Sequence, residues 1–387
     1  MKKILFINTT SGFSSTGNLT TELSQIEGFE SLVCYGRKHD YVGVNSYRFA
    51  NIIDNIFGAF QTILFDNNLN ICSIATKRLI KKIKDFNPDI INIHNLHGYY
   101  VNIEMLFNFL KEYNKPVVMT LHDAWTMTGY CPHFDGIGCE KYQTKCEDCK
   151  YGFSYPFSIF KQNVTFDYEK KKELFNSIEN LTIVTPSKWL ESVVKKSILK
   201  NNKVQTIYNG INLNAFKKSK EKNNIFTVLA VANIWTKEKG IDELNKIIPL
   251  LDKDIEVIVV GQNSEKIKGV KSIARTSNRQ ELIDLYSSAS ILINPTIQET
   301  LGLVNVEANA CGTPVITYAT GGSPETINED SGIVVDKFDY KKFAEAINNL
   351  KNNYYFIEDK VIENSKRFDK QLMLDNYKKL FNWHSAN

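Results

Sequence analysis

The sequence predicts an α/β protein of two domains, each built on an open parallel sheet. Short apolar runs that read as buried strands alternate with helical stretches, and this alternation gives parallel strands joined by crossover helices. The chain has 387 residues, of which 43% are hydrophobic, and this is enough for two domains of ordinary size. A charged and polar segment, KKSKEKNN from Lys217 to Asn224, separates the two series of elements.

The first series of elements occupies residues 1–205. Its predicted strands are Ile4–Ile7, Leu32–Tyr35, Ile90–Ile93, Val117–Leu121 and Leu181–Val184. Its predicted helices begin near Leu19, cover Ile52–Phe65, Ala75–Phe86 and Val164–Ile178, and start again after a cap near Ser187. The loop TTSGFSSTGN after the first strand contains Gly17, where backbone can approach a ligand closely. A plain strand-to-helix turn would have the same composition.

Two histidine-bearing segments follow predicted strands of this domain, IHNLHG from Ile93 and LHDAW from Leu121. Ligands of open sheets bind at the carboxyl ends of the strands. His122 is therefore a candidate site residue, and His94 and His97 are weaker candidates for contact with an acceptor. A lone histidine is more often structural, and this alternative stays open.

Residues 124–160 interrupt the alternation with Gly, Pro, aromatic residues and four cysteines, spaced C-x7-C-x6-C-x2-C. The closing C-x-x-C presents two thiolates to one ion. We predict one structural zinc at these cysteines, with His133 as a reserve ligand; the four are Cys131, Cys139, Cys146 and Cys149. Free buried thiols and an iron–sulfur cluster are the alternatives.

The second series of elements occupies residues 206–366. Its predicted strands are Phe226–Val231, Ile255–Val260, Ile291–Ile293 and Val315–Thr317, with a helix starting near Gly240. After Lys342 the chain is predicted to be helical to its end. We expect the last segment, residues 367–387, to form a helix that packs back on the first domain.

The stretch from Asn294 to Thr326 carries the strongest signal for a ligand. Pro295 ends a strand, and Thr300 is a predicted cap of a helix that runs to about Ala310. The unpaired N–H groups at this helix start form an anion site. Glu299 and Glu307 lie roughly 10 Å apart along the helix axis, a span that suits a sugar, a pyrophosphate and a ribose. The alternative makes Glu299 a dipole partner and Glu307 a solvated residue.

The same stretch resembles a known family. E-x7-E followed by NACGTPVI and TGGSPE resembles the donor site of the family-four retaining glycosyltransferases. HNLHGYY, TLHDAW and the cysteine-bearing loop resemble a subgroup found in bacterial capsule, exopolysaccharide and lipopolysaccharide clusters. The resemblance implies a GT-B fold, in which two Rossmann-like domains with parallel sheets face an interdomain cleft. Residues 1–205 would form the acceptor-side domain, with the insertion at 124–160, and residues 206–366 the nucleotide-sugar-binding domain.

The resemblance also implies roles for single residues. VANIWTKEKG resembles the segment whose lysine grips the diphosphate, which points to Lys239. The family's preceding arginine is replaced by Asn233, and Lys237 is the predicted substitute. The segment 272–282, with Arg275, falls where the family holds the base by main-chain contacts. The implied catalytic residues are His122, Lys239 and Glu299, and the implied donor-binding residues are Gly17, Lys237, Lys239, Arg275, Glu299, Thr300, Gly302, Leu303, Val304 and Glu307.

The implied function is transfer of a sugar from a UDP- or GDP-sugar, with retention at the anomeric carbon, to a glycan or lipid-linked acceptor in surface polysaccharide synthesis. Lysine and the helix start supply the positive field, so we expect no divalent metal in the donor site. A nucleotide-sugar epimerase of the same fold is one alternative. A non-catalytic, zinc-bearing binding protein on the same scaffold is another.

Charge and hydropathy limit the partners and the location. A net charge of +4 is too small for a dedicated nucleic-acid binder. No apolar run approaches the ~18 residues of a membrane span, and the first residues lack a signal peptide's core, so we expect a cytoplasmic protein. Arg78, Lys81, Lys82 and Lys84 cluster in TKRLIKKIK and predict peripheral contact with the inner face of the cytoplasmic membrane. An ordinary solvated helix face is the alternative.

Overall fold

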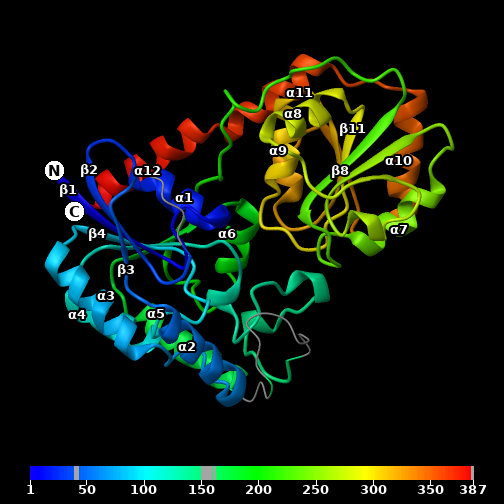
Figure 1. Ribbon diagram of the computed structural model, residues 1–387. Coiled ribbons are helices and arrows are strands. Elements are labelled where there is room, and N and C mark those ends of the chain that lie inside the picture. The colour runs from blue at the N-terminus through cyan, green and yellow to red at the C-terminus, as the bar shows by residue number, and fades with distance from the viewer. Residues whose placement is uncertain (39–42, 150–158, 160–162, 385–387) are drawn as a thin grey trace. The chain divides into compact units, whose positions relative to one another are not determined.

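The computed structural model describes residues 1–38, 43–149, 159 and 163–384, and the chain forms two compact units (Figure 1). Unit 1 is Met1–Ile207 with Leu374–Asn387, and unit 2 is Tyr208–Met373. The chain therefore returns to unit 1 at Leu374, within the predicted terminal segment. Residues 150–158 and 160 of the predicted insertion lie outside the described residues. Among the helices that the structure describes, none combines the length and apolar composition needed to cross a membrane.

Unit 1 is built on a seven-stranded sheet in which every pairing is parallel. In spatial order the strands are β3 (Ser46–Arg48), β2 (Phe29–Tyr35), β1 (Lys2–Asn8), β4 (Ile90–Ile93), β5 (Val117–Thr120), β6 (Leu181–Thr185) and β7 (Lys203–Thr206). The helices are α1 (Ser14–Ser24), α2 (Ile52–Phe65), α3 (Ser73–Phe86), α4 (Ile103–Tyr113), α5 (Val164–Asn176), α6 (Lys188–Val194) and α12 (Lys370–His384).

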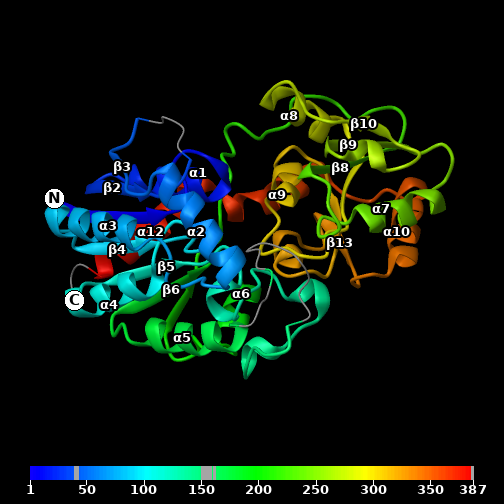
Figure 2. The ribbon, with the colours of Figure 1, turned by 60° about the horizontal axis from the view of Figure 1, so that its bottom comes forward.

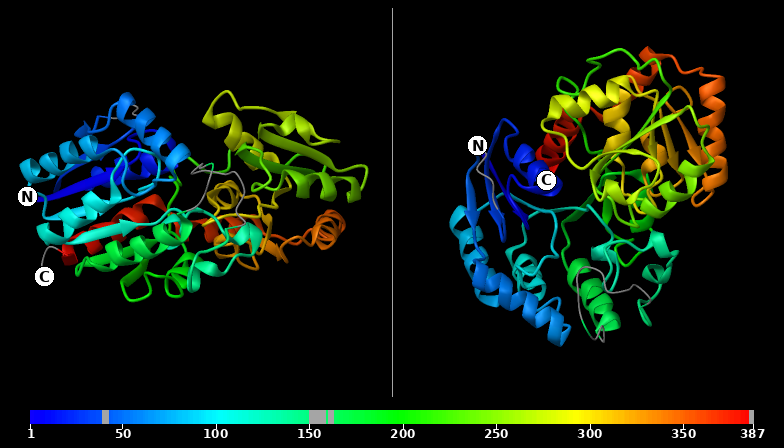
Figure 3. Two further views of the ribbon diagram at one scale, coloured as in Figure 1. Left: turned by 90° about the horizontal axis from the view of Figure 1, so that it is seen from below. Right: turned by 45° about the vertical axis from the view of Figure 1, so that its right-hand side comes forward.

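The central strands β4, β5 and β6 of unit 1 are buried on both faces, as parallel strands with helices on each side must be. One face packs against α3, α4 and α5, where Leu79, Leu106 and Phe175 join the core. The other face receives α12, whose Phe381 ring meets the ring of Phe6 edge to face at 6.1 Å. The left-hand view of Figure 3 shows α12, in red, lying against the strands of unit 1.

Unit 2 is built on a six-stranded parallel sheet. In spatial order the strands are β10 (Lys271–Ile273), β9 (Glu256–Gln262), β8 (Thr227–Ile234), β11 (Ile291–Asn294), β12 (Val315–Tyr318) and β13 (Gly332–Val335). The helices are α7 (Ile241–Ile247), α8 (Arg279–Ser288), α9 (Leu303–Ala310), α10 (Tyr340–Asn352) and α11 (Glu358–Ser365). In Figure 1, α9 and α10 lie on opposite sides of β8. One face of the sheet therefore packs against α8 and α9, and the other against α7 and α10.

Four strands that the sequence analysis missed are β3, β7, β10 and β13, and all four are edge strands. An edge strand pairs on one side only and is partly exposed, so its sequence lacks the apolar run of a central strand. Helices α4 and α8 were also missed. The buried residues Ile103, Leu106, Phe107 and Leu110 of α4 have the helical spacing that would have found it. The predicted start of the first helix at Leu19 is wrong, because α1 begins at Ser14.

Candidate functional site

Two loops of unit 2 are held together where β8 and β11 end. The Glu238 carbonyl accepts hydrogen bonds from the Ile297 amide at 2.9 Å and from the Thr296 hydroxyl at 3.0 Å. Gly240 has a φ of 87° and lies so close to Pro295 that a Cβ atom would overlap the Pro295 carbonyl oxygen. Only glycine fits this position, and the close approach places the segment that carries Lys239 beside the segment that carries Glu299.

Lys239 and Glu299 form an ion pair at this junction. The Lys239 Nζ donates to Glu299 Oε2 at 2.8 Å, and the Thr300 amide donates to Glu299 Oε1 at 3.1 Å. The lysine side chain is 43% exposed and the glutamate side chain 17%. A carboxylate has about four acceptor positions, so Glu299 keeps capacity for hydroxyl donors. The pair brings an ammonium group and a carboxylate with remaining acceptor positions to one point.

The predicted helix start is present, but its cap is not the predicted one. Helix α9 begins at Leu303, and Gly302 is its N-cap with a φ of 94° and no side-chain cap. Thr300 is therefore not the cap. The left-handed conformation at Gly302 makes the chain turn two residues after Thr300. The space beside this backbone is narrow, because a Cβ atom on Gly302 would lie 3.2 Å from the Ser323 hydroxyl. Within the described residues, the amides of Gly302, Leu303 and Val304 have no protein hydrogen-bond acceptor, as expected at a helix start.

Two buried hydroxyls add to the polar character behind this helix start. Ser323 and Thr320 are 0% and 1% exposed, and their hydroxyl groups have no hydrogen-bond partner among the described residues. Buried hydroxyls are normally paired. The Ser323 hydroxyl lies beside Gly302, so a further unpaired hydroxyl stands next to the helix start.

Glu307 lies one turn into α9, and Tyr286 of α8 holds it in place. The Tyr286 hydroxyl donates to Glu307 Oε2 at 2.9 Å. Burial raises the pKa of Glu307 to about 7, against the lowering effects of the Tyr286 hydrogen bond and the Arg279 charge. Tyr286 and Arg279 were not identified from the sequence, because nothing in their local pattern links them to Glu307.

A buried amide network fixes α9 on the sheet. The Asn294 side chain donates to Asn305 Oδ1 at 2.9 Å, and the Asn305 side chain donates to the Thr326 hydroxyl at 2.9 Å. The Thr326 hydroxyl in turn donates to the Ser323 carbonyl at 2.6 Å. The network ties the end of β11, the first turn of α9 and the Ser323–Thr326 turn into one rigid group. The signal in the sequence that could have revealed this network is a polar residue at each of its three buried positions.

The structure places the other predicted donor residues without giving them partners that define a role. Lys237 is exposed in the loop before Gly240, and Arg275 is exposed in the loop after β10. Gly17 is buried in α1, where a Cβ atom would lie 2.6 Å from the Thr10 hydroxyl. Close packing on Thr10 explains this glycine without a ligand. The donor-binding roles of these three residues stay predictions.

In unit 1, three residues at the ends of β4 and β5 form a hydrogen-bond relay. Asn92 donates its amide protons to the Val118 carbonyl at 3.0 Å and the Thr120 hydroxyl at 3.1 Å. Its Oδ1 lies 2.9 Å from His94 Nε2, and His94 Nδ1 lies 3.0 Å from His122 Nε2. A carbonyl oxygen only accepts, so His94 carries its proton on Nε2 and accepts at Nδ1.

Burial sets the protonation state of His122, and the relay sets its tautomer. Burial lowers the pKa of His94 well below its ordinary value, and it lowers the pKa of His122 to about 4. Both rings are therefore neutral near pH 7. Because His94 Nδ1 accepts, His122 donates from Nε2, and its Nδ1 keeps a lone pair that can accept a hydroxyl proton.

A second histidine stands beside this relay. His97 Nε2 lies 2.8 Å from Asp123 Oδ2, and the Trp125 amide donates to Asp123 Oδ1 at 2.8 Å. Burial acts to raise the pKa of Asp123, but the charge and hydrogen bond of His97, with further contributions from His133 and the Trp125 amide, bring it to about 2. The sequence analysis treated His94 and His97 as separate candidates, whereas each is the direct partner of a residue in the LHDAW segment.

The four cysteines of the insertion line one cavity of about 370 Å³, and none of the seven cysteines forms a disulfide. Burial raises the pKa of the Cys131 thiol to about 12 and raises that of Cys146 as well. Among the described residues, no three His, Cys, Asp or Glu side chains stand close enough together to hold a metal ion. The four cysteines therefore line one cavity, but their thiols do not meet at a single point. The zinc site stays a prediction.

Lys171 of α5 organises the start of the same loop. Its Nζ is buried and donates to the carbonyls of Trp125 at 2.8 Å, Thr128 at 3.0 Å and Gly129 at 3.4 Å. It also lies 3.4 Å from the centre of the Trp125 ring. Burial lowers its pKa to about 8, opposed by the charge of Asp167. A buried ammonium group that donates to three carbonyls holds residues 125–129 in place.

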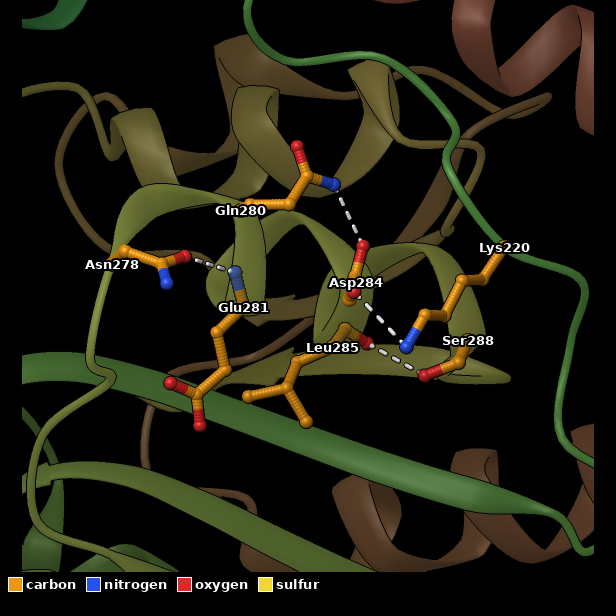
Figure 4. Close-up of a pocket in the computed structure, with 7 residues that line it drawn as sticks. All are labelled: Lys220, Asn278, Gln280, Glu281, Asp284, Leu285 and Ser288. Atoms are coloured by element: carbon orange, nitrogen blue, oxygen red, sulfur yellow. Dashed lines mark hydrogen bonds and ion pairs between the residues drawn. The ribbon is translucent and has the colours of Figure 1, made fainter.

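A hollow of about 300 Å³ also lies on α8 of unit 2 (Figure 4). Its polar side chains are paired with one another: Asp284 accepts from Gln280 Nε2 at 2.8 Å and forms an ion pair with Lys220 at 3.0 Å. Three of the residues that line it, Asn278, Gln280 and Glu281, lie in the segment 272–282 that the resemblance places at the base, but none of them was itself named as a site residue. Its polar groups are already satisfied, so it is a weaker candidate than the Lys239 and Glu299 region.

Sequence comparison gives two family matches that together cover most of the chain. A family model described as Glycosyltransferase Family 4 matches residues 18–215, and one described as Glycosyl transferases group 1 matches residues 225–353. The capsular polysaccharide biosynthesis glycosyltransferase CapM of Staphylococcus aureus is 28% identical over 223 residues, 49% of this chain and 58% of CapM. The D-inositol 3-phosphate glycosyltransferase of Mycolicibacterium smegmatis is 39% identical over 74 residues, 19% of this chain and 17% of that protein. The matched regions thus span less than two thirds of these relatives.

Structure comparison gives the fold. Sucrose-phosphate synthase from Thermosynechococcus elongatus superposes with a TM-score of 0.69 at 16% identity, covering 100% of both chains. Anabaena Alr3699/HepE in complex with UDP-glucose superposes with a TM-score of 0.65 at 14% identity, covering 99% of this chain and 100% of that one. WaaG, a glycosyltransferase involved in lipopolysaccharide biosynthesis, superposes with a TM-score of 0.64 at 14% identity over 97% of this chain and 99% of that one. The two parallel sheets are those of the GT-B fold, and the chain belongs to Glycosyltransferase Family 4.

Proposed function

We propose that the protein transfers a sugar from a nucleotide-sugar donor to a glycan or lipid-linked acceptor in bacterial surface polysaccharide synthesis. The observation that carries the proposal is the Lys239–Glu299 pair beside the open amides at the start of α9. This arrangement offers a positive charge and aligned N–H groups to a diphosphate, and a carboxylate to the hydroxyls of the sugar attached to it. The similarity to CapM supports the polysaccharide role.

In the proposed mechanism, the diphosphate lies against the amides of Gly302, Leu303 and Val304. Negative charge builds on the leaving phosphate as the glycosidic bond breaks, and preorganised donors stabilise that charge most in the transition state. Lys239 moves from Glu299 toward the phosphate, or contacts both groups at once. Glu299 then accepts hydrogen bonds from sugar hydroxyls.

Glu307 and His122 have binding roles in this proposal. Tyr286 occupies Oε2 of Glu307, which leaves Oε1 to accept from the ribose hydroxyls. His122 is the predicted contact to the transferred sugar, with Nδ1 as its acceptor. The acceptor's own proton would pass to the leaving phosphate, since attack on the same face retains the anomeric configuration.

The location in the cytoplasm, at the inner face of the cytoplasmic membrane, stays part of the proposal.

The donor is proposed to be a UDP-sugar, with a GDP-sugar as the alternative. Anabaena Alr3699/HepE was solved with UDP and with UDP-glucose, and a pneumococcal O-GlcNAc transferase of the same fold was solved with UDP and GlcNAc.

A donor screen followed by product analysis tests the proposal. A UDP- or GDP-sugar that binds should raise the unfolding free energy by about 2.7 kcal/mol at 100 times its dissociation constant. The donor that stabilises most is then incubated with membrane lipid extract or glycan fragments, and the product is examined by mass spectrometry and proton NMR. We expect a new glycoside with the donor's anomeric configuration. Conversion of the donor to an epimer with no transfer, or no stabilisation by any donor, would contradict the proposal.

A further inference from the structure

A cavity of about 430 Å³ lies at the amino ends of the strands of unit 1. Five adjacent strands contribute to its wall, each through a charged residue at its first position or within two residues before it: Lys2 (β1), Asp89 (β4), Lys115 (β5), Glu179 (β6) and Lys203 (β7). The amino ends of neighbouring parallel strands meet at one edge of a sheet, so residues far apart in the sequence come together here. In Figure 2 the end of α12, in red, and the start of β1, in dark blue, lie at the same end of unit 1.

The last turn of α12 supplies an aromatic wall to this cavity. Trp383 lines it and is 47% exposed. The Lys203 Nζ lies 3.2 Å from the centre of the Trp383 ring, and the His384 ring stands nearly perpendicular to it with the ring centres 4.7 Å apart. These two contacts hold the indole in one orientation, so little side-chain freedom is lost when a ligand packs on it.

His384 lines the same cavity and carries a polar atom without a partner. The residue is 7% exposed, and its Nε2 is buried with no hydrogen-bond partner among the described residues. Buried polar atoms are normally paired. Burial lowers the pKa of His384 to about 4, and the charge of Lys203 acts in the same direction, so the ring is neutral near pH 7. The nitrogens of a neutral imidazole can donate to one hydroxyl group and accept from another.

The charged side chains of the wall include both donors and acceptors that are open. Within the part of the chain that the structure describes, Lys115 and Glu179 make no side-chain hydrogen bond or ion pair. Asp89 Oδ2 accepts from the Lys3 amide at 2.8 Å, which leaves acceptor positions on Oδ1. This distinguishes the cavity from the hollow on α8, whose polar groups are paired with one another.

We propose that this cavity is a second binding site of the protein and that it takes an oligosaccharide. A sugar ring packs its C–H face on an aromatic side chain, while its hydroxyl groups both donate and accept hydrogen bonds. The volume lies within the range of roughly 300–1,000 Å³ that is usual for small-molecule sites. An anion fits less well, because the carboxylates of Asp89 and Glu179 face the same space as the lysines. An apolar ligand fits less well, because it would cover charged groups without pairing them.

The cavity is separate from the histidine relay of the same unit. His94 and His122 follow the carboxyl ends of β4 and β5, whereas Asp89 and Lys115 precede the amino ends of these strands. A strand of four residues spans roughly 13 Å, so a sugar in the cavity does not reach the relay. Binding is measured without a donor, so its failure leaves the proposed transfer reaction untouched. Failure to transfer sugar would likewise leave a binding result standing.

The test starts with a microarray of glycan fragments from bacterial capsules, exopolysaccharides and lipopolysaccharides. The glycan that binds best is then titrated in solution by calorimetry, with the fold of every variant checked by thermal unfolding. We expect Trp383→Ala to weaken binding at least about fivefold through the lost aromatic contact. Glu179→Gln should weaken it about threefold or more, since a hydrogen bond to a charged group is stronger than one to an amide. This second variant lies in a loop and does not alter α12.

Two control variants locate the binding. Tyr355→Ala removes an aromatic side chain of unit 2 that is 59% exposed, and it should bind as the wild type does. His122→Ala changes the other edge of the unit 1 sheet and should also leave glycan binding unchanged. Loss of binding in His122→Ala, with Trp383→Ala and Glu179→Gln unaffected, would place the glycan at the relay and overturn the proposal.

Fluorescence gives a second readout, because Trp383 is one of four tryptophans in the chain. Addition of the glycan should change the emission of the wild type. Trp383→Phe keeps an aromatic side chain and should still bind, but without the change in emission. The proposal is overturned if no glycan on the array binds, if the change in emission persists in Trp383→Phe, or if inorganic phosphate displaces the glycan, which would identify an anion site instead.

Discussion

His122 owes its chemical state to residues that never need to touch a ligand. The Asn92 amide fixes the proton of His94, and His94 fixes the proton of His122. The sequence placed His122 and His94 at neighbouring strand ends, because that follows from the alternation of strands. It did not show which nitrogen carries the proton, since this depends on three side chains meeting across β4 and β5.

The relay can be observed directly by NMR of protein labelled with ¹⁵N-histidine. We expect His122 to be protonated at Nε2 only and to show no titration between about pH 5.5 and pH 8, since its pKa is about 4. His94→Phe removes the acceptor and should release the tautomer of His122. Signals are assigned with His122→Gln. A His122 ring that titrates near pH 6.5, or that carries its proton on Nδ1, would refute the relay.

Glu307 gives a prediction about pH and stability. Its pKa is about 7 in the fold and 4.5 in a free glutamate, so the folded state holds the proton more tightly. The contribution of this group to stability is present in full below about pH 4.5 and is lost as the pH rises through 7. Relative to Glu307→Gln, the wild type should lose on the order of 1–3 kcal/mol of unfolding free energy between about pH 5 and pH 8.

Urea unfolding of the two proteins across this pH range measures the difference. Glu329→Gln, at an exposed position, is the matched control and should follow the wild type at every pH. Parallel curves for the wild type and Glu307→Gln would show that burial does not raise the pKa of Glu307.

At the scale of elements, the central strands and most helices were predictable, and the edges were not. Apolar runs identify a strand that helices cover on both faces, whereas β3, β7, β10 and β13 lie at sheet edges and carry mixed sequences. The helix start at α9 was found from the sequence, but its cap was misplaced at Thr300. A left-handed glycine cap depends on the tight space beside Ser323, which is set by a segment some twenty residues later.

Three glycines with positive φ allow the free-energy cost of backbone strain to be measured apart from the cost of steric overlap. Gly28 has a φ of 98° with open space around it, Gly302 has a φ of 94° with Ser323 at 3.2 Å, and Gly240 has a φ of 87° with the Pro295 carbonyl in the way. Gly28→Ala should cost about 1 kcal/mol, Gly302→Ala more, and Gly240→Ala the most. Only the last two should also weaken donor binding. Urea unfolding and donor titration measure both effects, and three equal costs would contradict the packing described at Gly240 and Gly302.

The cysteine loop gives the element-scale prediction with the largest chemical consequence. We predict about one zinc per chain in protein purified without added metal, held when the four thiols converge from the walls of their cavity. Elemental analysis measures it, and Cys146→Ser/Cys149→Ser should lose the metal. Less than a trace of zinc or iron, together with four thiols that alkylate readily in the native state, would remove the metal. The buried Lys171 would then be what orders the loop.

At the scale of the whole molecule, the two units carry different chemistry. Unit 2 holds the paired Lys239 and Glu299, the open amides of α9 and Glu307. Unit 1 holds the histidine relay, the cysteine loop and the exposed apolar side chains of α2, among them Ile53 and Phe57. The sequence predicted this division because chemistry-bearing residues follow strand ends in both series of elements. It did not predict that apolar side chains of α2 are exposed, since a helix pattern alone does not tell which side the rest of the fold covers.

The central claim is that the start of α9 with Lys239 binds the donor diphosphate and that Glu307 binds the ribose. The most direct test is to measure kcat and KM for the donor in Lys239→Ala and Glu307→Ala. Lys239→Ala should lower kcat more than it raises KM, because it acts on charge that develops in the transition state, whereas Glu307→Ala should chiefly raise KM. Equal and small effects of both changes on kcat/KM would contradict the account and place the donor elsewhere.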